Sequence, residues 1–136
     1  MRREADDLVA VELLPDEIRL LSSGLSEWGG PAQCTDELAV AMGFLDVHNL
    51  FQEAGRLRAA LKEGAALTRR DWARILAATE IVFASDIFGA GVDWETTTGM
   101  SDEETIRLLR KVQRKLSLHV HGPAAQLGKR NPRSQY

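Results

Sequence analysis

Cysteine is almost absent from this chain of 136 residues, in which Cys34 is the only thiol. A single cysteine excludes an internal disulfide framework and fits a reducing compartment. The chain also lacks any apolar run near the roughly 18 residues that a membrane-spanning helix needs. Its first residues, MRREADD, are charged where a secretory signal has an apolar stretch. We therefore expect a cytoplasmic protein that does not enter the membrane.

Acidic residues are missing from the C-terminal part of the chain. No Asp or Glu follows Glu104, whereas residues 105–136 contain eight Lys and Arg side chains. Residues 1–104 therefore carry a net charge of −11 within an overall charge of −3. A basic end of this kind can bind nucleic acid, bind an acidic protein surface, or fold back onto the acidic part of its own chain.

Apolar residues recur with helical spacing in four segments of the chain. The residues expected to face the core are Leu14, Ile18, Leu21, Leu25 and Trp28 in the first segment, Val47, Leu50, Phe51, Ala54, Leu57 and Leu61 in the second, Trp72, Ile75, Leu76, Thr79, Val82 and Phe83 in the third, and Ile106, Leu109, Val112 and Leu116 in the fourth. The third helix is expected to extend to about Phe88 and to be central, because it is apolar nearly all round.

Start and stop signals divide these segments. Thr35, Thr68 and Ser101 stand where a side chain can cap the first turn of a helix. Gly43 and Gly64 stand where helices end. Before the first helix, residues 7–14 fit either an extended lead-in or the start of the helix itself.

These patterns predict an all-α fold, a compact bundle of about four main helices. We expect one helical domain over residues 1–121. Residues 122–136 lack apolar periodicity and are expected to form a short, disordered basic tail.

An internal duplication is one interpretation of the pattern. A shift of about 55 residues places DEIRLLSS (16–23) over DWARILAA (71–78), and one more residue places MGFLD (42–46) over TGMSD (98–102). Residues 14–61 and 69–116 would then be pseudo-repeats. Two unrelated helical hairpins could produce the same pattern.

The polar loop GAGVDWETTTGMSDEE, part of the segment 86–104, is a candidate metal or small-ligand site. Oxygen-bearing side chains follow Asp93 at several positions of a calcium loop, but Thr98 stands where the turn requires glycine. The glycines also lack the Gly-Lys-Ser/Thr ending of a phosphate-binding loop. A polar connection whose Trp94 fills the core is the other interpretation.

Helix-turn-helix binding of DNA is a further alternative. Ala39 and Gly43 have the spacing of the first helix and turn of such a reader. The helices that would enter the groove begin with carboxylates, at Asp46 and at Asp102, and carboxylates repel phosphates.

Few residues of the chain are suited to catalysis, so we expect that the protein is not an enzyme. Cys34 and His48 would act together only if the fold brought them into contact. Glu80 and Asp86 lie in the most apolar segment and need partners if they are buried. Arg19 and Arg74 are the candidates, as structural ion pairs.

The function expected from the sequence is non-enzymatic. A small bacterial regulatory, adaptor or immunity-type protein that binds a macromolecule fits best, without a cofactor or metal. The surface expected to bind a partner, here named the basic face, consists of Arg107, Arg110, Lys111, Arg114 and Lys115. The partner is a protein with an acidic surface or, as the alternative, a nucleic acid bound by this helix and the tail. A homo-oligomer is also compatible with the sequence.

Overall fold

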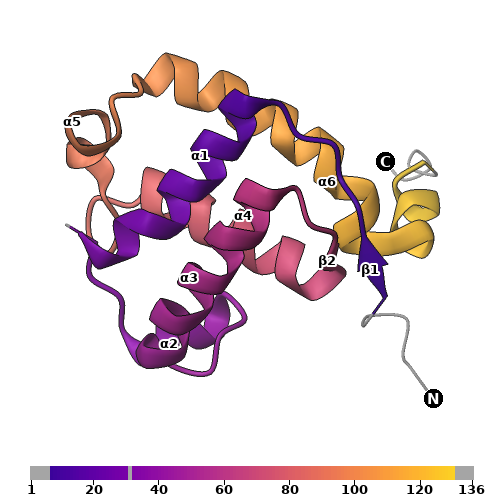
Figure 1. Ribbon diagram of the computed structural model, residues 1–136, viewed down its shortest axis with the longest axis horizontal. Helices are drawn as coiled ribbons and strands as arrows, with labels where there is room; N and C mark the ends of the chain where they lie inside the picture. The colour runs from indigo at the N-terminus through magenta and orange to yellow at the C-terminus, as the bar shows by residue number, and fades with distance from the viewer. Residues whose placement is uncertain (1–6, 31, 131–136) are drawn as a thin grey trace.

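The computed structural model describes residues 7–30 and 32–130, and the side chains within them up to His119. These residues form an all-α fold, as the sequence predicts (Figure 1). The longer helices are α1 (Pro15–Ser26), α3 (Val47–Glu63), α4 (Arg69–Ala84) and α6 (Asp102–Arg130), and the shorter ones are α2 (Asp36–Ala41) and α5 (Trp94–Thr98). A single 3-10 turn, η2 (Glu27–Gly29), follows α1, and another, η3 (Gly91–Asp93), precedes α5.

Helix α1 is the centre of the bundle and packs against α3, α4 and α6. Figure 1 shows α6 along one edge of the molecule and α2 at the opposite edge, with α5 close to the start of α6. No helix among the described residues is long and apolar enough to cross a membrane.

Three tryptophans anchor the core, and each indole N–H has a partner. Trp28 Nε1 donates to the carbonyl of Ala78 at 3.2 Å, and Trp72 Nε1 donates to the carbonyl of Val9 at 3.0 Å. Trp94 Nε1 donates to Thr105 Oγ1 at 2.8 Å. Burial of a tryptophan is favourable when its N–H is satisfied in this way. Trp94 does fill the core, as one interpretation of the polar loop required.

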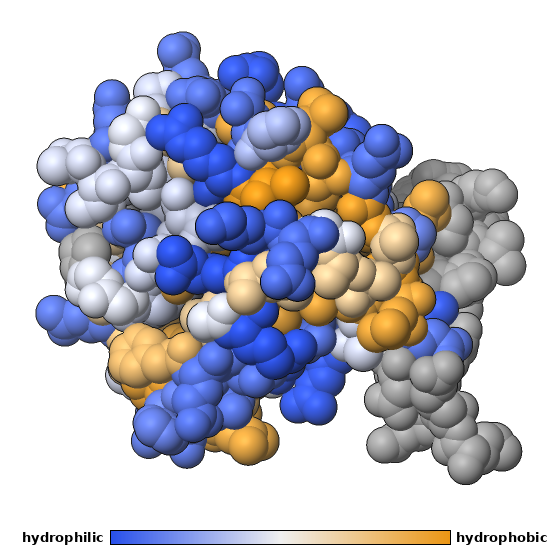
Figure 2. Space-filling view, in the orientation of Figure 1, coloured by the Kyte–Doolittle hydropathy of each residue, from blue (hydrophilic) through white to orange (hydrophobic). Residues whose placement is uncertain are grey.

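The segment before α1 is extended. Strand β1 (Leu8–Val9) pairs with strand β2 (Leu67–Thr68) in antiparallel register, Leu8 opposite Thr68. The sequence allowed an extended lead-in but did not predict β2, because a strand of two residues has no detectable periodicity. Figure 2 shows apolar surface gathered on the side of the molecule along which this segment runs.

The predicted caps of three helices are confirmed. Thr35 Oγ1 accepts from the N–H of Leu38, Thr68 Oγ1 from that of Asp71, and Ser101 Oγ from that of Glu104, at 3.0–3.1 Å. Gly64 ends α3 in the left-handed conformation, with φ 70°.

Helix α4 ends at Ala84, before the predicted end near Phe88. Ser85 is extended, and its Oγ accepts hydrogen bonds from the N–H groups of Ile87 and Phe88. A serine that captures the following amides competes with the helix for them, and the helix therefore ends there.

The predicted stripes are corrected at three residues: Leu14, Phe51 and Ile106 are exposed. Leu14 is the extended residue before α1, so its side chain does not lie on the helix face. In α6 the buried stripe is Thr105, Leu108, Val112 and Leu116. The predicted and the observed stripe share Val112 and Leu116, and apolar spacing alone does not distinguish them.

Helix α6 continues to Arg130, and thus into the segment for which the sequence predicts a disordered tail (122–136). Residues 131–136 lie outside the described residues.

Equivalent features recur at a spacing of 55 residues. The N-cap of α3 is Asp46 and that of α6 is Ser101. Three pairs of buried residues follow them at the same spacing: Leu50 and Thr105, Leu57 and Val112, and Leu61 and Leu116. Gly24 and Thr79 have this spacing too, and they lie against each other between α1 and α4. The duplication itself stays a prediction.

Candidate functional site

The basic face of α6 is only partly a free surface. Four of its members are exposed, namely Arg107, Arg110, Lys111 and Arg114. Arg110 Nη1 donates to Gln113 Oε1 at 2.9 Å. None of the four forms an ion pair with a carboxylate of the described side chains. Since residues three and four apart share a side of a helix, these cations form one continuous positive strip.

Lys115 is separate from the other members. Its ammonium group donates to Glu17 Oε1 at 2.6 Å and to the carbonyl of Glu12 at 3.0 Å. The Lys115 side chain is 33% exposed, whereas that of Glu17 is 1% exposed. Lys115 thus ties α6 to α1 and to the N-terminal segment, and its charge is already compensated within the protein.

Glu17 is the most deeply buried carboxylate of the described residues. Its Oε1 also accepts from the N–H of Leu14 at 2.8 Å, as the glutamate of a capping box does. Its other oxygen, Oε2, is buried without a hydrogen-bond partner. Burial alone raises the pKa of Glu17, but the bonds from Lys115 and Leu14 and the charges of Lys115 and Lys111 outweigh it. The pKa of Glu17 in the folded protein therefore lies below its ordinary value of 4.5.

Replacing Glu17 with glutamine makes a pH-dependent difference to stability. Because the pKa of Glu17 is lowered on folding, its ionised form stabilises the folded protein above about pH 4.5. This stabilisation is lost as the pH falls through the pKa of Glu17 in the folded protein. We expect the variant to be less stable than the original protein at neutral pH, and the difference between them to shrink on acidification. Urea unfolding between about pH 7 and pH 3 measures this. Asp16→Asn, an exposed neighbour, is the control, and a difference that is independent of pH would contradict the expectation.

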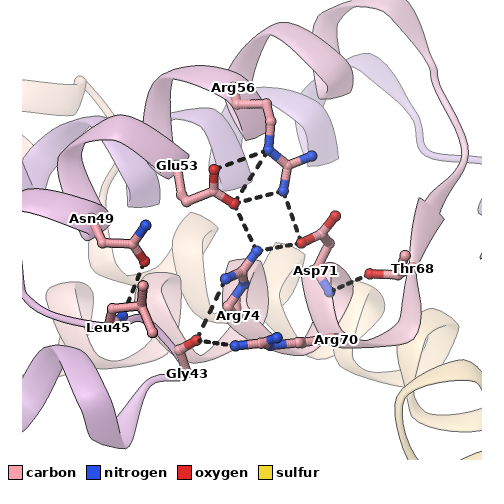
Figure 3. Close-up of polar contacts among 9 residues, drawn as sticks. All are labelled: Gly43, Leu45, Asn49, Glu53, Arg56, Thr68, Arg70, Asp71 and Arg74. Atoms are coloured by element: carbon pink, nitrogen blue, oxygen red, sulfur yellow. Dashed lines mark hydrogen bonds and ion pairs between the residues drawn. The ribbon is translucent and has the colours of Figure 1, made fainter. Parts of the chain in front are cut away.

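A second group of charged residues joins α3 to α4 (Figure 3). Arg74 Nη2 donates to Asp71 Oδ1 at 2.5 Å and to Glu53 Oε1 at 2.8 Å, and Arg56 contacts the same two carboxylates. The Arg74 guanidinium carbon lies 5.0 Å from the centre of the Phe44 ring. Hydrogen bonding by Arg56 is the main cause that lowers the pKa of Glu53, against the effect of burial.

This group explains the turn between α2 and α3. The carbonyl of Gly43 accepts from Arg70 and Arg74 at 3.5 Å each. A side chain at Gly43 would meet Arg74, and φ there is 104°. The cluster therefore holds the turn on α4, and its charges compensate one another within the protein.

The predicted partners of Glu80 and Asp86 are wrong. Glu80 is half-buried and accepts from Gln113 Nε2 at 2.8 Å, while Asp86 is exposed. Arg19 donates to the carbonyl of Thr98 at 3.0 Å and so holds the end of α5 on α1.

The loop 86–104 does not have the geometry of a calcium loop. Residues 94–98 form α5, Thr97 Oγ1 donates to Glu27 Oε1 at 2.5 Å, and Ser101 caps α6. Within the described part of the chain, no three His, Cys, Asp or Glu side chains are grouped so that they could hold a metal ion. A hollow of about 300 Å³ does open beside the loop, lined by Phe83, Ala84, Asp86, Gly91, Val92 and Asp102.

Cys34 and His48 do not form a reactive pair in the described contacts. The Cys34 thiol donates to the carbonyl of Thr35 at 3.2 Å, and His48 is exposed. Burial, followed by the charge of Asp36, raises the pKa of the Cys34 thiol. A raised pKa favours the thiol over the nucleophilic thiolate.

No family model, no curated protein and no solved structure matches this chain. Any function must therefore be argued from the surface itself. One part of that surface was not predictable from the sequence. Ile106 and Leu118, on α6 itself, are 49% and 50% exposed beside the cations.

Proposed function

We propose that this chain is a non-enzymatic regulatory or adaptor protein, of the general kind that includes immunity proteins, which binds an acidic protein surface through the basic face. The observation that carries the proposal is the set of side chains that α6 exposes. Four exposed cations, none of them in an ion pair with a carboxylate of the described side chains, lie beside two half-exposed apolar side chains, Ile106 and Leu118.

This combination favours a protein partner over nucleic acid. Protein interfaces combine apolar with charged side chains, and Ile106 and Leu118 add apolar surface at the two ends of the strip of cations. A phosphate backbone, in contrast, is bound by cations and helix N-termini. The N-terminus of α6 carries Asp102, Glu103 and Glu104, which repel phosphate.

Charge reversal on the basic face tests the proposal. We expect Arg107→Glu/Lys111→Glu to weaken binding of a labelled peptide rich in glutamate and leucine by about tenfold at low salt. Fluorescence polarisation measures the affinity, and added salt should weaken binding by the original protein. The matched control is Arg58→Glu/Lys62→Glu, which reverses the same two residue types at the same spacing on exposed positions of α3.

Each result has a defined meaning. Equal loss in both variants would show that only net charge matters and would contradict a specific site. Tighter binding of an arbitrary DNA duplex than of the peptide would favour the nucleic-acid alternative. Failure of the original protein to bind either probe at low salt would overturn the proposal.

A further inference from the structure

A small hollow lies between the extended segment before α1 and the end of α3. Its volume is about 230 Å³, and none of the described side chains of α6 lines it. The N-terminal hollow, as it is named here, has a mostly apolar lining. Besides Glu12 and Gly64, the lining residues are Val11, Leu13, Ile18, Leu61, Ala65 and Trp72.

The N-terminal hollow forms where two segments of the chain diverge. Strands β1 and β2 pair over only two residues each, and continued pairing in the same register would place Val11 opposite Ala65. Instead, the segment that contains Val11 runs on to α1, while Gly64, with φ 70°, turns the chain out of α3 directly before Ala65. Ala65 carries only a methyl group and leaves space beside Val11. Protein interiors are otherwise closely packed, so this space next to the core is available to a ligand.

Apolar side chains form both the bottom and the walls of the N-terminal hollow. Leu61 and Trp72 are 2% and 1% exposed and close the bottom. Val11, Leu13 and Ile18 are half-buried. A ligand in the hollow would therefore cover apolar surface that is in contact with water in the free protein, which favours binding.

Hydrogen bonds hold the wall formed by the extended segment in place. Trp72 Nε1 donates to the carbonyl of Val9 and Lys115 Nζ to that of Glu12, each at 3.0 Å. The capping-box bond at the start of α1 fixes the end of the segment. The opposite side is open, because a side chain added at Gly64 would meet nothing within 4 Å. The site is thus formed before a ligand binds, which lowers the entropy lost on binding, and a ligand can enter without unfolding of the protein.

Size and charge define the class of ligand. An apolar cavity of about 150 Å³ suffices to bind benzene, and sites for drug-sized molecules begin at about 300 Å³. A molecule of the size of indole lies between these limits, and an aromatic ring gains from contact with the ring of Trp72. Glu12 is the one ionisable residue of the lining. Its carboxylate forms no ion pair with the described side chains, so its charge repels an anion.

We infer that the N-terminal hollow is a binding site for one small, uncharged aromatic molecule. This site is additional to the macromolecular contact proposed for the basic face, and the two share no residue. A molecule of this size makes few contacts, so the expected dissociation constant is about 1 mM for a simple ring such as indole.

Titration of the full chain with indole tests the inference. Saturable shifts are expected in the methyl NMR signals of Val11, Leu13, Ile18 and Leu61. Two variants fill the hollow from opposite walls, Ala65→Leu and Val11→Phe, and each should weaken indole binding by about tenfold. The matched controls make the same exchanges at exposed positions of α2, Ala41→Leu and Val40→Phe, and should bind indole like the original protein.

A charged probe tests the class of ligand. Indole-3-acetate adds a carboxylate to the same ring and should bind at least about threefold more weakly than indole, and Glu12→Gln should reduce this difference. Absence of saturable shifts, shifts at other residues only, or filled variants that bind like the original protein would overturn the inference. Equal affinity for indole and indole-3-acetate would overturn the assigned class. A short peptide with a central tryptophan that binds more tightly than indole would identify a protein side chain as the occupant and overturn the small-molecule site.

Discussion

Replacing Arg74 with methionine is expected to lower the free energy of unfolding by about 3 kcal/mol. Arg74 is 8% exposed and contacts two carboxylates, of which Asp71 is also buried. Removing one partner of a buried ion pair leaves the other charge without compensation, which costs about 3–5 kcal/mol. We take the lower end of this range because Arg56 still contacts Asp71 at 3.0 Å in the variant.

The matched control is Arg56→Met. Arg56 contacts the same carboxylates, but its side chain is 48% exposed, and exposed ion pairs contribute at most about 1 kcal/mol. Urea unfolding of both variants gives the comparison. The double variant Asp71→Asn/Arg74→Met should regain part of the loss, because it removes the buried charge as well. Equal destabilisation by the two single arginine variants would contradict this account.

Sequence patterns predicted the helices because their signals are local. Thr35, Thr68 and Ser101 each cap a helix through an amide three residues away, and Gly64 ends α3 with its own backbone conformation. Such interactions do not depend on the rest of the fold. The all-α architecture with four longer helices followed from them.

Pairings between distant residues were not predictable. The sequence indicated that Arg74 would be in a structural ion pair, but with Glu80 or Asp86 as partner. The observed partners are Asp71, one turn earlier in α4, and Glu53 in α3. Which carboxylate is within reach depends on how α3 packs across α4, and apolar periodicity does not contain that information.

The candidate site was predictable in composition but not in exposure. The excess of Lys and Arg on α6 is visible in the sequence, and four of these residues are exposed. That Lys115 is paired with Glu17 follows from a contact between residues 98 positions apart. That Ile106 is exposed follows from the rotation of α6 about its axis, which Leu108 and Thr105 decide by being buried.

Replacing Gly24 with alanine is expected to destabilise the protein by at least about 2 kcal/mol, although alanine favours a helix. An added methyl group would lie 2.2 Å from Thr79 Oγ1 and 2.6 Å from Thr79 Cβ. Thr79 is fully buried, and its hydroxyl donates to the carbonyl of Ile75 at 2.9 Å. The side chain therefore cannot move aside, and α1 must separate from α4. Thermal and urea unfolding measure the loss.

Gly55→Ala is the matched control, because nothing lies within 4 Å of the methyl group it would add to α3. It should stabilise the protein by up to about 1 kcal/mol through helix propensity alone.

The double variant Gly24→Ala/Thr79→Gly exchanges the small residue between α1 and α4. It should recover much of the free energy of unfolding that Gly24→Ala loses. The close contact requires one small residue where α1 and α4 cross, and either helix can supply it. Gly24 and Thr79 are 55 residues apart, the spacing of the predicted duplication, so the exchange tests whether the two helices are interchangeable at this point. If the double variant is as unstable as the sum of the single ones, the contact does not couple the two positions.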